Sequence, residues 1–521
     1  MLQVLPIGEQ NFEKIRQNNS LYIDKTKQIL QMLKKGTYYF LSRPRRFGKS
    51  LTISTLEAMF QGNAELFKGL YAEEWVKEQA NHPNPIIKLD MSGLGDFVNI
   101  KEFKSSLKDY IGEIIEDYNL NIELKETASR ILAKIIRELY KKFGLVVVLI
   151  DEYDFPITEF IDDMEKANNI RKFLRSFYGI LKTYSKYLRF VFITGISKFS
   201  KVGIFSGFNN LKDISIDKKY SDIVGYTQKE LENNFSEWIE KTSEEISMNK
   251  EELLKKIKYY YDGFSFDGIT KVYNPFSVLN FFDEGEFGNY WYNSATPSFL
   301  AKYLKKHKIK DQKEFTNKKV SIDFTNSREI ENASVESFLY QAGYLTIVKR
   351  EGNMITLYYP NEEVRSSMTQ LSLDSFYNIT DYMNLGYELW EATKNADIKK
   401  IVDIFNEALK PIPYDDYPNR GEFWYRSLFM MLLYTTRLLA FPEPHTFDGR
   451  PDIVIPFDDR LIILEFKFAK TSSEVDKKLE RAEDQVAHYA ESYKLAGKEI
   501  VTAVIVIDNE KKQAISYQQN L

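Results

Sequence analysis

The segment RPRRFGKS, at positions 43–50, has residue types and spacing suited to binding phosphate. Gly48, Lys49 and Ser50 follow a strand-like run and precede a helix-like pattern, so backbone N–H groups at a helix N-terminus would face an anion. The Lys49 ammonium can neutralise the β and γ phosphates of a nucleotide, and the Ser50 hydroxyl can ligate Mg²⁺. Because a GKS tripeptide also occurs by chance, the surrounding pattern must decide whether it binds a nucleotide.

An acidic pair follows the continuously apolar run LVVVLI, which indicates a strand buried on both faces. Asp151 and Glu152 would therefore lie at the carboxyl edge of a parallel sheet, where such folds bind ligands. We expect Asp151 to support the Mg²⁺ ion from behind its direct ligands and Glu152 to polarise the attacking water. A solvated loop would explain an isolated Asp-Glu pair equally well, but the succession of strand, GKS, helix and second strand favours nucleotide binding.

The start of the phosphate segment departs from the usual pattern G-x-x-x-x-G-K-[ST]. Arg43 replaces the first glycine, and Pro44 pushes Arg43 toward extended geometry, so this part of the loop must be reshaped. Arg45 and Arg46 can compensate by donating hydrogen bonds to the phosphates. The alternative, that these two arginines pair with acids elsewhere in the fold, is equally compatible with the sequence.

The segment GRPDIVIPFDDRLIILEFKFAK holds a second set of candidate residues. DIVIPF and LIILEFKF are strand-like on either side of residues 458–460, which predicts a hairpin. Residues two apart on a strand share a face, so Glu465 and Lys467 should point the same way while Phe466 enters the core. If the register places Asp452 beside Glu465, their oxygens can share one hard cation such as Mg²⁺, or alternatively Mn²⁺. That ion would stabilise a pentavalent phosphate and acidify a water that Lys467 orients.

Two residues outside the hairpin strengthen this interpretation. Glu422 begins the apolar helix pattern EFWYRSLFMMLL, from which its carboxylate can reach the same metal, and Gln485 lies in the later helix pattern RAEDQVAHYA. The alternative is an amphipathic edge hairpin whose charged side chains are solvated or paired across strands. A histidine metal site is not expected, because no i, i+4 pair occurs among His82, His307, His445 and His488.

These candidate residues need a scaffold that brings strand ends together, and the first third of the chain predicts one. Strand-like runs alternate with helix-like patterns there, which is typical of a parallel sheet covered by helices. The expected strands are 38–41, 86–89, 145–150 and 190–194, and the expected helices include 51–60 and 131–140. If the strand ending at Thr194 lies between those bearing GKS and the acidic pair, its hydroxyl can reach the γ-phosphate or the water. An ordinary strand-end hydroxyl is the alternative.

The rest of the chain shows two further patterns. Residues 226–380 contain short helices and aromatic-rich stretches, which we interpret as a helical, winged-helix-like lid. Eight lysines between Ala301 and Lys319 oppose only Asp311 and Glu314, so a solvated surface is the simpler explanation and a phosphate-contacting patch the alternative. The elements expected after residue 381 include strands at 452–457, 461–468 and 501–507 and a helix at 480–495.

Composition limits the classes of protein that fit. With 521 residues, 43% of them hydrophobic and 28% charged, the chain should fold into roughly two to four globular domains. Its 71 Lys and Arg residues against 75 Asp and Glu residues give a net charge of −4, so any site for a polyanion must be local. The absence of cysteine excludes disulfide frameworks and thiol chemistry, and no apolar run is long enough to span a bilayer. We therefore expect a soluble, cytoplasmic protein without membrane contact.

Seven segments occur in an order that resembles a known family: PIGEQNFEKIR, YIDKT, RPRRFGKSL, LIDEYD, ITGISKFS, GFNNLKDISI and YNPFSVLN. They are similar to the predicted AAA-ATPase-like family of prokaryotes, in which Arg-Pro in place of the first glycine is normal. The resemblance covers nearly the whole chain and implies a P-loop ATPase core with the additional-strand sheet order and nucleotide near YIDKT. The implied nucleotide contacts are Arg45, Arg46, Phe47, Gly48, Lys49, Ser50, Leu51, Asp151 and Thr194, with Ser50 and Asp151 serving the metal.

That family usually carries a C-terminal PD-(D/E)XK nuclease-like domain. The expected C-terminal helix, mixed sheet and flanking helix resemble this fold, with matching positions Glu422, Asp452, Glu465, Lys467 and Gln485. The predicted fold is therefore α/β in three parts. These are a P-loop NTPase core, with helices on both faces of a parallel sheet, at 1–225; a helical, winged-helix-like lid at 226–380; and a restriction-endonuclease-like domain at 381–521.

The predicted function is an ATP-binding and ATP-hydrolysing module that controls a Mg²⁺-dependent nuclease. DNA is favoured over RNA as the substrate, and a homo-oligomer is compatible with the sequence. The main alternative is a nucleotide-dependent switch or scaffold whose C-terminal domain binds nucleic acid or protein without cutting. A third possibility is an ATPase with a purely structural C-terminal part.

Overall fold

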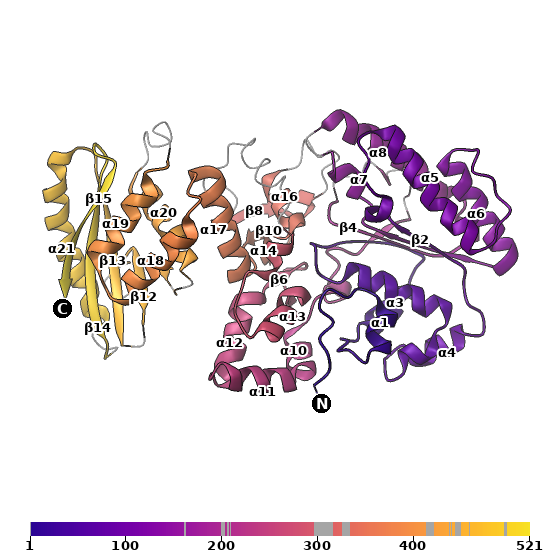
Figure 1. Cartoon of the computed structure of the whole chain (residues 1–521), viewed down its shortest axis with the longest axis horizontal. Coiled ribbons are helices and arrows are strands. Elements are labelled where there is room, and N and C mark those ends of the chain that lie inside the picture. The colour runs from indigo at the N-terminus through magenta and orange to yellow at the C-terminus, as the bar shows by residue number, and fades with distance from the viewer. Residues whose placement is uncertain are drawn as a thin grey trace. The chain divides into compact units, whose positions relative to one another are not determined.

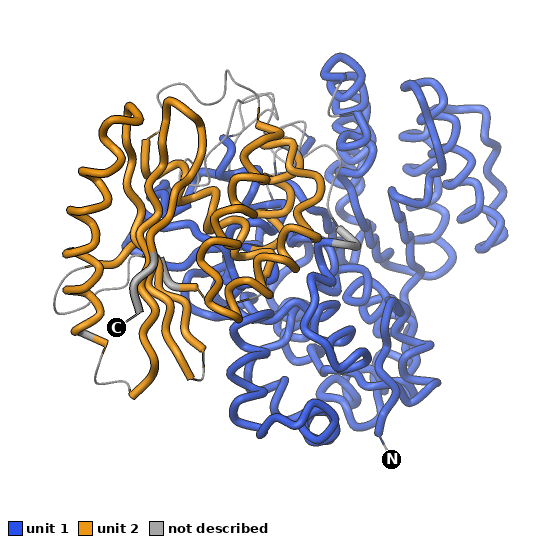
Figure 2. Tube along the Cα trace, turned by 60° about the vertical axis from the view of Figure 1, so that its left-hand side comes forward, with its two compact units in different colours: residues 1–304, 311–365 blue, residues 305–310, 366–521 orange. Residues whose placement is uncertain are grey.

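The computed structural model describes residues 2–160, 163–198, 204–205, 208, 210–295, 316–325, 334–412, 421–436, 438, 440–442, 450–457, 459–493 and 497–520. The chain forms two compact units (Figure 2): an N-terminal unit of residues 1–304 and 311–365, and a C-terminal unit of residues 305–310 and 366–521. The division falls within helix α17 (Glu362–Tyr377), and the sequence-based boundaries near residues 225 and 380 stay predictions. No described helix is long and apolar enough to cross a membrane.

A five-stranded parallel sheet forms the centre of the N-terminal unit, in the order β2-β3-β4-β1-β5. Its strands are β1 (Tyr38–Ser42), β2 (Ile86–Asp90), β3 (Val146–Asp151), β4 (Leu188–Gly195) and β5 (Lys212–Asp213). The four strands expected from the sequence are confirmed. Because β4 lies between β1 and β3, the order is that of the additional-strand class, and Thr194 pairs with Leu41 of β1.

Helices cover both faces of this sheet, as expected (Figure 1). One face carries α1 (Phe12–Gln17), α3 (Lys49–Gln61) and α4 (Glu73–Gln79), and the other carries α5 (Ile100–Asp117), α6 (Ala128–Phe143) and α8 (Met164–Thr183). The short helices α2 (Thr26–Leu33) and α7 (Phe155–Thr158) complete this part. Helix α3 stops at Gly62, whose φ is +74°, and a Cβ there would lie 2.4 Å from the Ala80 Cα.

The rest of the N-terminal unit is mainly helical, with two small antiparallel sheets. Its helices are α10 (Gln228–Asn234), α11 (Ser236–Glu245), α12 (Lys250–Tyr261), α13 (Pro275–Glu284), α14 (Tyr290–Ala295) and α16 (Val335–Ala342). Its strands are β6 (Phe264–Ser265), β7 (Lys271–Val272), β8 (Lys318–Ser321), β9 (Thr346–Glu351) and β10 (Met354–Tyr358), the last three in the order β8-β10-β9. Helix α16 is followed by the antiparallel β9–β10 hairpin, and the winged-helix-like interpretation stays a prediction. Most of the lysine-rich stretch, residues 301–315, lies outside the described residues.

A mixed sheet with the order β11-β12-β13-β14-β15 forms the centre of the C-terminal unit. Its strands are β11 (Phe441–Pro442), β12 (Ile453–Pro456), β13 (Arg460–Ala469), β14 (Glu499–Asp508) and β15 (Gln513–Asn520), and its helices are α18 (Tyr382–Lys394), α19 (Ile398–Leu409), α20 (Glu422–Thr435) and α21 (Val475–Tyr493). Strands β13 and β14 are parallel and joined through α21, while the other neighbours are antiparallel. The expected strands and helix are confirmed, although α21 begins before residue 480.

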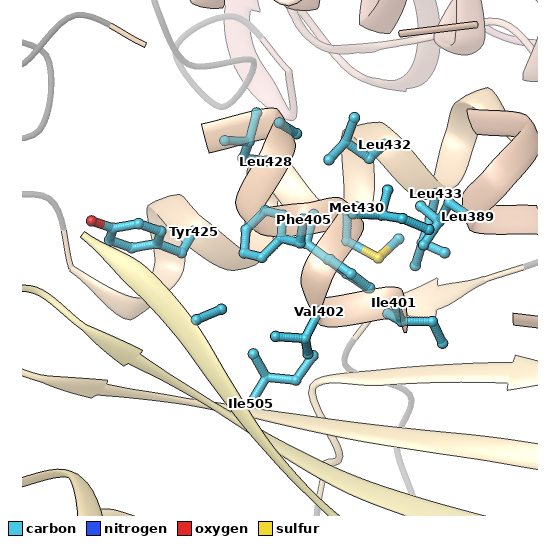
Figure 3. Packing of buried hydrophobic residues seen from close by; sticks show 14 of the residues in the cluster. Leu389, Ile401, Val402, Phe405, Tyr425, Leu428, Met430, Leu432, Leu433 and Ile505 are labelled. Carbon is cyan, nitrogen blue, oxygen red and sulfur yellow. The ribbon is translucent and has the colours of Figure 1, made fainter. Parts of the chain in front are cut away.

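Alternating side chains of the β12–β13 hairpin enter two separate cores. Ile453, Ile455 and Phe466 belong to a core with α18, α19 and α20, whose Phe405 and other labelled residues are seen in Figure 3. Ile463 belongs to a smaller cluster with Ala490 of α21. Since side chains alternate along a strand, Glu465 and Lys467 point away from the core that holds Phe466.

Candidate nucleotide and nuclease sites

The phosphate segment forms a loop between β1 and α3, with two residues in the left-handed backbone region. Helix α3 begins at Lys49, and Gly48 precedes it with a φ of +92°. Arg46 has a φ of +68°, a conformation that costs a residue with a Cβ about 1 kcal/mol or more. These two left-handed residues lie after Pro44, and the reshaping expected at the loop entry, at Arg43, stays a prediction.

Arg43 fixes this loop to the rest of the unit instead of facing the phosphate side. Its side chain is 1% exposed and donates hydrogen bonds to the backbone oxygens of Ser215 at 2.5 Å and Tyr220 at 3.2 Å. The guanidinium also lies 3.8 Å from the centre of the Phe266 ring. Burial lowers the pKa of Arg43 to about 10. These contacts of Arg43 leave no local signal in the sequence, because Ser215 and Tyr220 lie far along the chain.

Three further loop residues contact the mainly helical part of the unit. The ring of Phe47 is 1% exposed and lies 4.8 Å, centre to centre, from that of Phe264. The indole of Trp291, on α14, donates a hydrogen bond to the Arg45 backbone oxygen at 3.3 Å. A Cβ on Gly343 would lie 2.8 Å from the Pro44 Cβ, so the Pro44 ring lies directly against the backbone of Gly343. The position of Phe47 is therefore mainly structural, and the nucleotide contact implied for it stays a prediction.

Lys49 lies on the inner side of the loop. Its Nζ atom donates hydrogen bonds to the backbone oxygens of Arg43 at 3.0 Å and Pro44 at 2.9 Å. Burial lowers the pKa of Lys49, while the carboxylates of Glu152 and Asp151 act in the opposite direction. Neutral carbonyls hold this cation, so a phosphate, which carries full negative charge, would be a stronger partner.

A cavity of about 410 Å³ opens beside the loop, within the size range of small-molecule sites. Arg45 and Arg46 line it, and neither forms an ion pair with an acid among the described residues. Arg46 lies 5.0 Å from the Phe276 ring centre. The cavity wall also includes Gly48, Lys49, Ser50, Leu51 and Glu152 together with the apolar and aromatic residues Leu21, Tyr22, Ile23, Val224, Tyr226 and Phe276. One region of the cavity is thus cationic and another is apolar, which suits a nucleotide.

The acidic pair lies at the end of β3, as expected. Asp151 is 5% exposed and accepts a hydrogen bond from the hydroxyl of Thr194 on the neighbouring strand β4. It also accepts one from the Glu152 backbone N–H at 3.0 Å. Glu152 has a φ of +46°, lines the cavity, and has its pKa raised by burial. The Thr194 hydroxyl is thus engaged with Asp151, and Thr194 is not one of the cavity-lining residues.

Three candidates of the C-terminal hairpin meet at one place. The register of β12 and β13 pairs Ile453 with Leu464, which sets Asp452 beside Glu465. The Asp452 N–H donates to Glu465 Oε2 at 3.2 Å, and Asp452 Oδ2 accepts from the Phe466 N–H at 2.7 Å. Lys467 Nζ donates to Glu465 Oε1 at 2.7 Å. Asp452 and Glu465 are only 7% and 3% exposed.

Burial and mutual repulsion change the acidity of this cluster. Burial and then the Asp452 carboxylate raise the pKa of Glu465 to about 7, against the opposing hydrogen bond from Lys467. Glu422, the first residue of α20, also has its pKa raised by burial, opposed by the Lys467 charge. Helix α20 packs against β13 of the hairpin, so the Lys467 charge acts on Glu422.

Two further residues complete the description of this site: Arg426, which the sequence analysis did not single out, and Gln485, whose predicted role stays a prediction. Arg426, one turn after Glu422 on α20, forms an ion pair with Asp452 Oδ1. The i, i+4 spacing from Glu422 was the only sequence signal for Arg426. Gln485 donates to the Tyr489 hydroxyl at 2.6 Å within α21, and no hydrogen bond joins it to Asp452 or Glu465 in the described part of the chain.

Two family models match this chain, one in its N-terminal part and one in its C-terminal part. Residues 6–205 match a predicted AAA-ATPase family model, and residues 420–517 match a PD-(D/E)XK nuclease superfamily model. The chain is 32% identical, over 529 residues, to an uncharacterised protein in the vnfD 5′ region of Azotobacter chroococcum mcd 1, covering 98% of each chain. This chain belongs to the predicted AAA-ATPase-like family. Its C-terminal domain belongs to the PD-(D/E)XK nuclease superfamily.

Solved structures are similar to this AAA-ATPase-like protein only at low TM-scores. The Walker-type ATPase paby2304 of Pyrococcus abyssi is 12% identical with a TM-score of 0.36, covering 67% of this chain and 96% of the other. The Aeropyrum pernix ORC2 protein, as ADPNP-ADP complexes, is 10% identical at 0.27, covering 80% and 85%. The Aeropyrum pernix ORC1 protein in complex with DNA is 9% identical at 0.26, covering 68% and 94%.

ATPase and PD-(D/E)XK domains generally use a nucleotide and divalent metals, and the donors of this AAA-ATPase-like protein fit both. Lys49, Arg45 and Arg46 suit the phosphates of a nucleotide. Asp452 and Glu465 form a pair of hard oxygen donors of the kind that Mg²⁺ takes together with waters. In the described residues, no group of three or more His, Asp or Glu side chains is arranged as a ready metal cage. A metal would therefore be held by the two hairpin carboxylates and water, and Glu422 does not complete a three-residue metal group with them.

Proposed function

We propose that this protein binds and hydrolyses ATP in its N-terminal unit and uses the nucleotide state to control Mg²⁺-dependent phosphodiester cleavage in its C-terminal unit. The observation that carries the proposal is the meeting of Asp452, Glu465 and Lys467 on two neighbouring strands. Burying two carboxylates beside a lysine costs free energy of folding, and a bound divalent ion would offset that cost. DNA is the proposed substrate, with RNA as the alternative, and the cytoplasm is the proposed location.

In the nucleotide site, the side chains have distinct proposed tasks. Lys49 would exchange its two carbonyl partners for the β and γ phosphates, while Arg45 and Arg46 add positive charge at the mouth of the cavity. The Ser50 hydroxyl would ligate Mg²⁺, and Asp151, oriented by Thr194, would hold the water around that ion. Glu152, whose pKa burial raises, would accept a proton from the attacking water.

In the nuclease site, the hairpin carboxylates act as metal ligands. Bound Mg²⁺ would supply Lewis acidity toward the scissile phosphate. Asp452 is held in place by the Phe466 N–H, and Glu465 is held by Lys467, so both carboxylates have fixed orientations before any ion arrives. Lys467 would then orient the attacking water or offset the charge of the pentavalent phosphate. Gln485 would contact the substrate from α21 if its hydrogen bond to Tyr489 opens.

Helix α17 is the proposed route from nucleotide to nuclease. Its second residue, Glu363, accepts hydrogen bonds from the Trp291 backbone N–H and the Ser277 hydroxyl, both at 2.8 Å. Trp291 in turn binds the Arg45 backbone in the phosphate loop at 3.3 Å. A loop that shifts on binding ATP can therefore move the start of α17, and the rest of that helix belongs to the C-terminal unit.

The deciding experiment incubates the full chain with labelled single- and double-stranded DNA and RNA, with and without ATP, and with Mg²⁺ or Mn²⁺. We expect metal-dependent DNA cleavage that changes with ATP, that is lost in Glu465→Gln, and that loses its ATP response in Lys49→Met. Cleavage that persists unchanged in Glu465→Gln would refute the nuclease assignment. Mass photometry of the same samples tests for a homo-oligomer.

One observation favours a second candidate function, a nucleotide-dependent switch that binds nucleic acid or protein without cutting. Arg426 already compensates the negative charge of Asp452, so this carboxylate does not need a metal ion for charge balance. In that case the full chain would bind DNA in an ATP-dependent manner, and no nucleic acid would be cleaved under any metal condition.

A further inference from the structure

Arg426 is a cation built into the candidate metal site. It lies on α20 and pairs with Asp452 Oδ1, and the two side chains are 13% and 9% exposed. The second oxygen of Asp452 accepts the Phe466 N–H at 2.7 Å. An ion pair this buried is strongly coupled, because removing one partner leaves the other charge without compensation.

The charges of the site are divided between two separate pairs. Lys467 serves Glu465 at 2.7 Å, and Arg426 serves Asp452, so each hairpin carboxylate has its own cation. A divalent ion shared by the two carboxylates would add two positive charges at the same oxygens. Lys467 bonds to the Oε1 atom of Glu465, and Oε2 faces the Asp452 backbone N–H. Asp452 is held in the same way: the Arg426 guanidinium pairs with Oδ1 and the Phe466 N–H donates to Oδ2, so Arg426 is the cation that an incoming ion meets at Asp452.

We propose that Arg426 is a positioning residue that holds Asp452 while the metal is absent and competes with the divalent ion for it. The inference rests on the proposed nuclease function, since it concerns the same metal site. Arg426 thereby sets the metal concentration at which the site fills. A guanidinium is always charged, so this competition does not fade at neutral pH. A purely structural arginine would have the opposite effect when removed, because a loosened site binds metal more weakly.

The test measures Mn²⁺ binding to the full chain, without nucleotide, by calorimetry and by electron paramagnetic resonance. The binding that disappears in Asp452→Asn defines the C-terminal site. We expect Arg426→Met and Arg426→Gln to bind Mn²⁺ on the order of tenfold more tightly than the wild type. This is the scale expected when one elementary charge is removed a few ångströms from a dication, even at the dielectric constant of water.

Two controls separate competition from other effects. Arg426→Lys keeps the charge and should stay within about threefold of the wild type. Lys410→Met removes an exposed cation directly after α19, where Lys410 pairs with Glu407, and should leave Mn²⁺ affinity unchanged. Circular dichroism identifies any variant that fails to fold, and the Gln variant, which can still donate to Asp452, is the milder of the two.

The outcomes distinguish this inference from the function on which it rests. If folded Arg426→Gln binds Mn²⁺ no more tightly than the wild type, while Asp452→Asn abolishes binding, the competition is refuted and the metal site stands. If neither the wild type nor any Arg426 variant shows binding that depends on Asp452, the metal-dependent function fails together with the inference.

Discussion

The two candidate sites hold their lysines in different ways. Lys49 is held by neutral backbone carbonyls of its own loop, and Arg45 and Arg46 beside it have no acid partner among the described residues. Lys467 is held by a carboxylate, and Arg426 by another. The cations of the N-terminal site are therefore not neutralised by carboxylates of the described residues and can bind an anion. The C-terminal site has balanced its carboxylates with internal cations, which a metal must outcompete.

The largest expected effect comes from breaking the carboxylate pair of the C-terminal site. Glu465→Gln removes one of two metal donors and should lower Mg²⁺-dependent DNA cleavage by roughly a thousandfold or more, as losses of catalytic ligands do. The measurement is the initial rate on labelled DNA. Asp459→Asn, in the exposed hairpin turn where Asp459 contacts Arg460, is the matched control and should cut normally. Equal rates in both variants would mean that the hairpin carboxylates are not metal ligands.

The next effect concerns the anion site. Lys49→Met removes the cation that faces the cavity and should weaken binding of a fluorescent ATP analogue by roughly a hundredfold, the scale of a lost charged hydrogen bond in a buried site. Lys88→Met, which removes a half-exposed lysine of β2 that pairs with Glu57 of α3, is the control and should bind normally. Weaker Mn²⁺ binding by the C-terminal unit in Lys49→Met would contradict the assignment of Lys49 to a separate anion site.

A buried carboxyl outside both sites predicts a pH effect on stability. Burial raises the pKa of Glu363 to about 8, so this group keeps its proton in the fold at pH values where the unfolded chain has lost it. Its contribution is complete below the unfolded pKa and is lost as pH rises toward 8. Between pH 7 and 9, stability should fall by about 1 kcal/mol from this group. Denaturant unfolding should show the decline in the wild type and not in Glu363→Gln.

The smallest predicted effect tests the contact between the phosphate loop and α14. Trp291→Phe keeps most of the ring but loses the hydrogen bond to the Arg45 oxygen, worth about 1 kcal/mol. ATP affinity should change by only a few fold, while the response of DNA cleavage to ATP should be reduced. Trp390→Phe, on α18 of the C-terminal unit, is the control. An unchanged ATP response in Trp291→Phe would exclude this contact from the coupling route.

The sequence predicted the parts of both sites that depend on local patterns. GKS between strand and helix, the acidic pair after β3, and the alternation around Glu465 and Lys467 are all short-range signals, and the structure has each element where it was expected. Thr194 was predicted only conditionally, since its place beside Asp151 depends on strand order.

The partners of the two arginines could not be predicted in this way. Arg43 binds the backbone at Ser215 and Tyr220, and Arg426 binds Asp452, so each contact joins segments that only the complete fold brings together. A buried arginine gives no periodic signal in the sequence, and its role depends on which oxygen it reaches. The charge balance of both sites was therefore visible only in three dimensions.

Helix α17 has a practical consequence for dividing this protein into pieces. It is one continuous rod of 16 residues, about 24 Å long, that the two units share, with the division between Arg365 and Ser366. A truncation at that point would leave two frayed helix ends, and the exposed turns would lack their backbone partners. Expression of the C-terminal half alone should therefore start ahead of Glu362, so that the whole rod is retained.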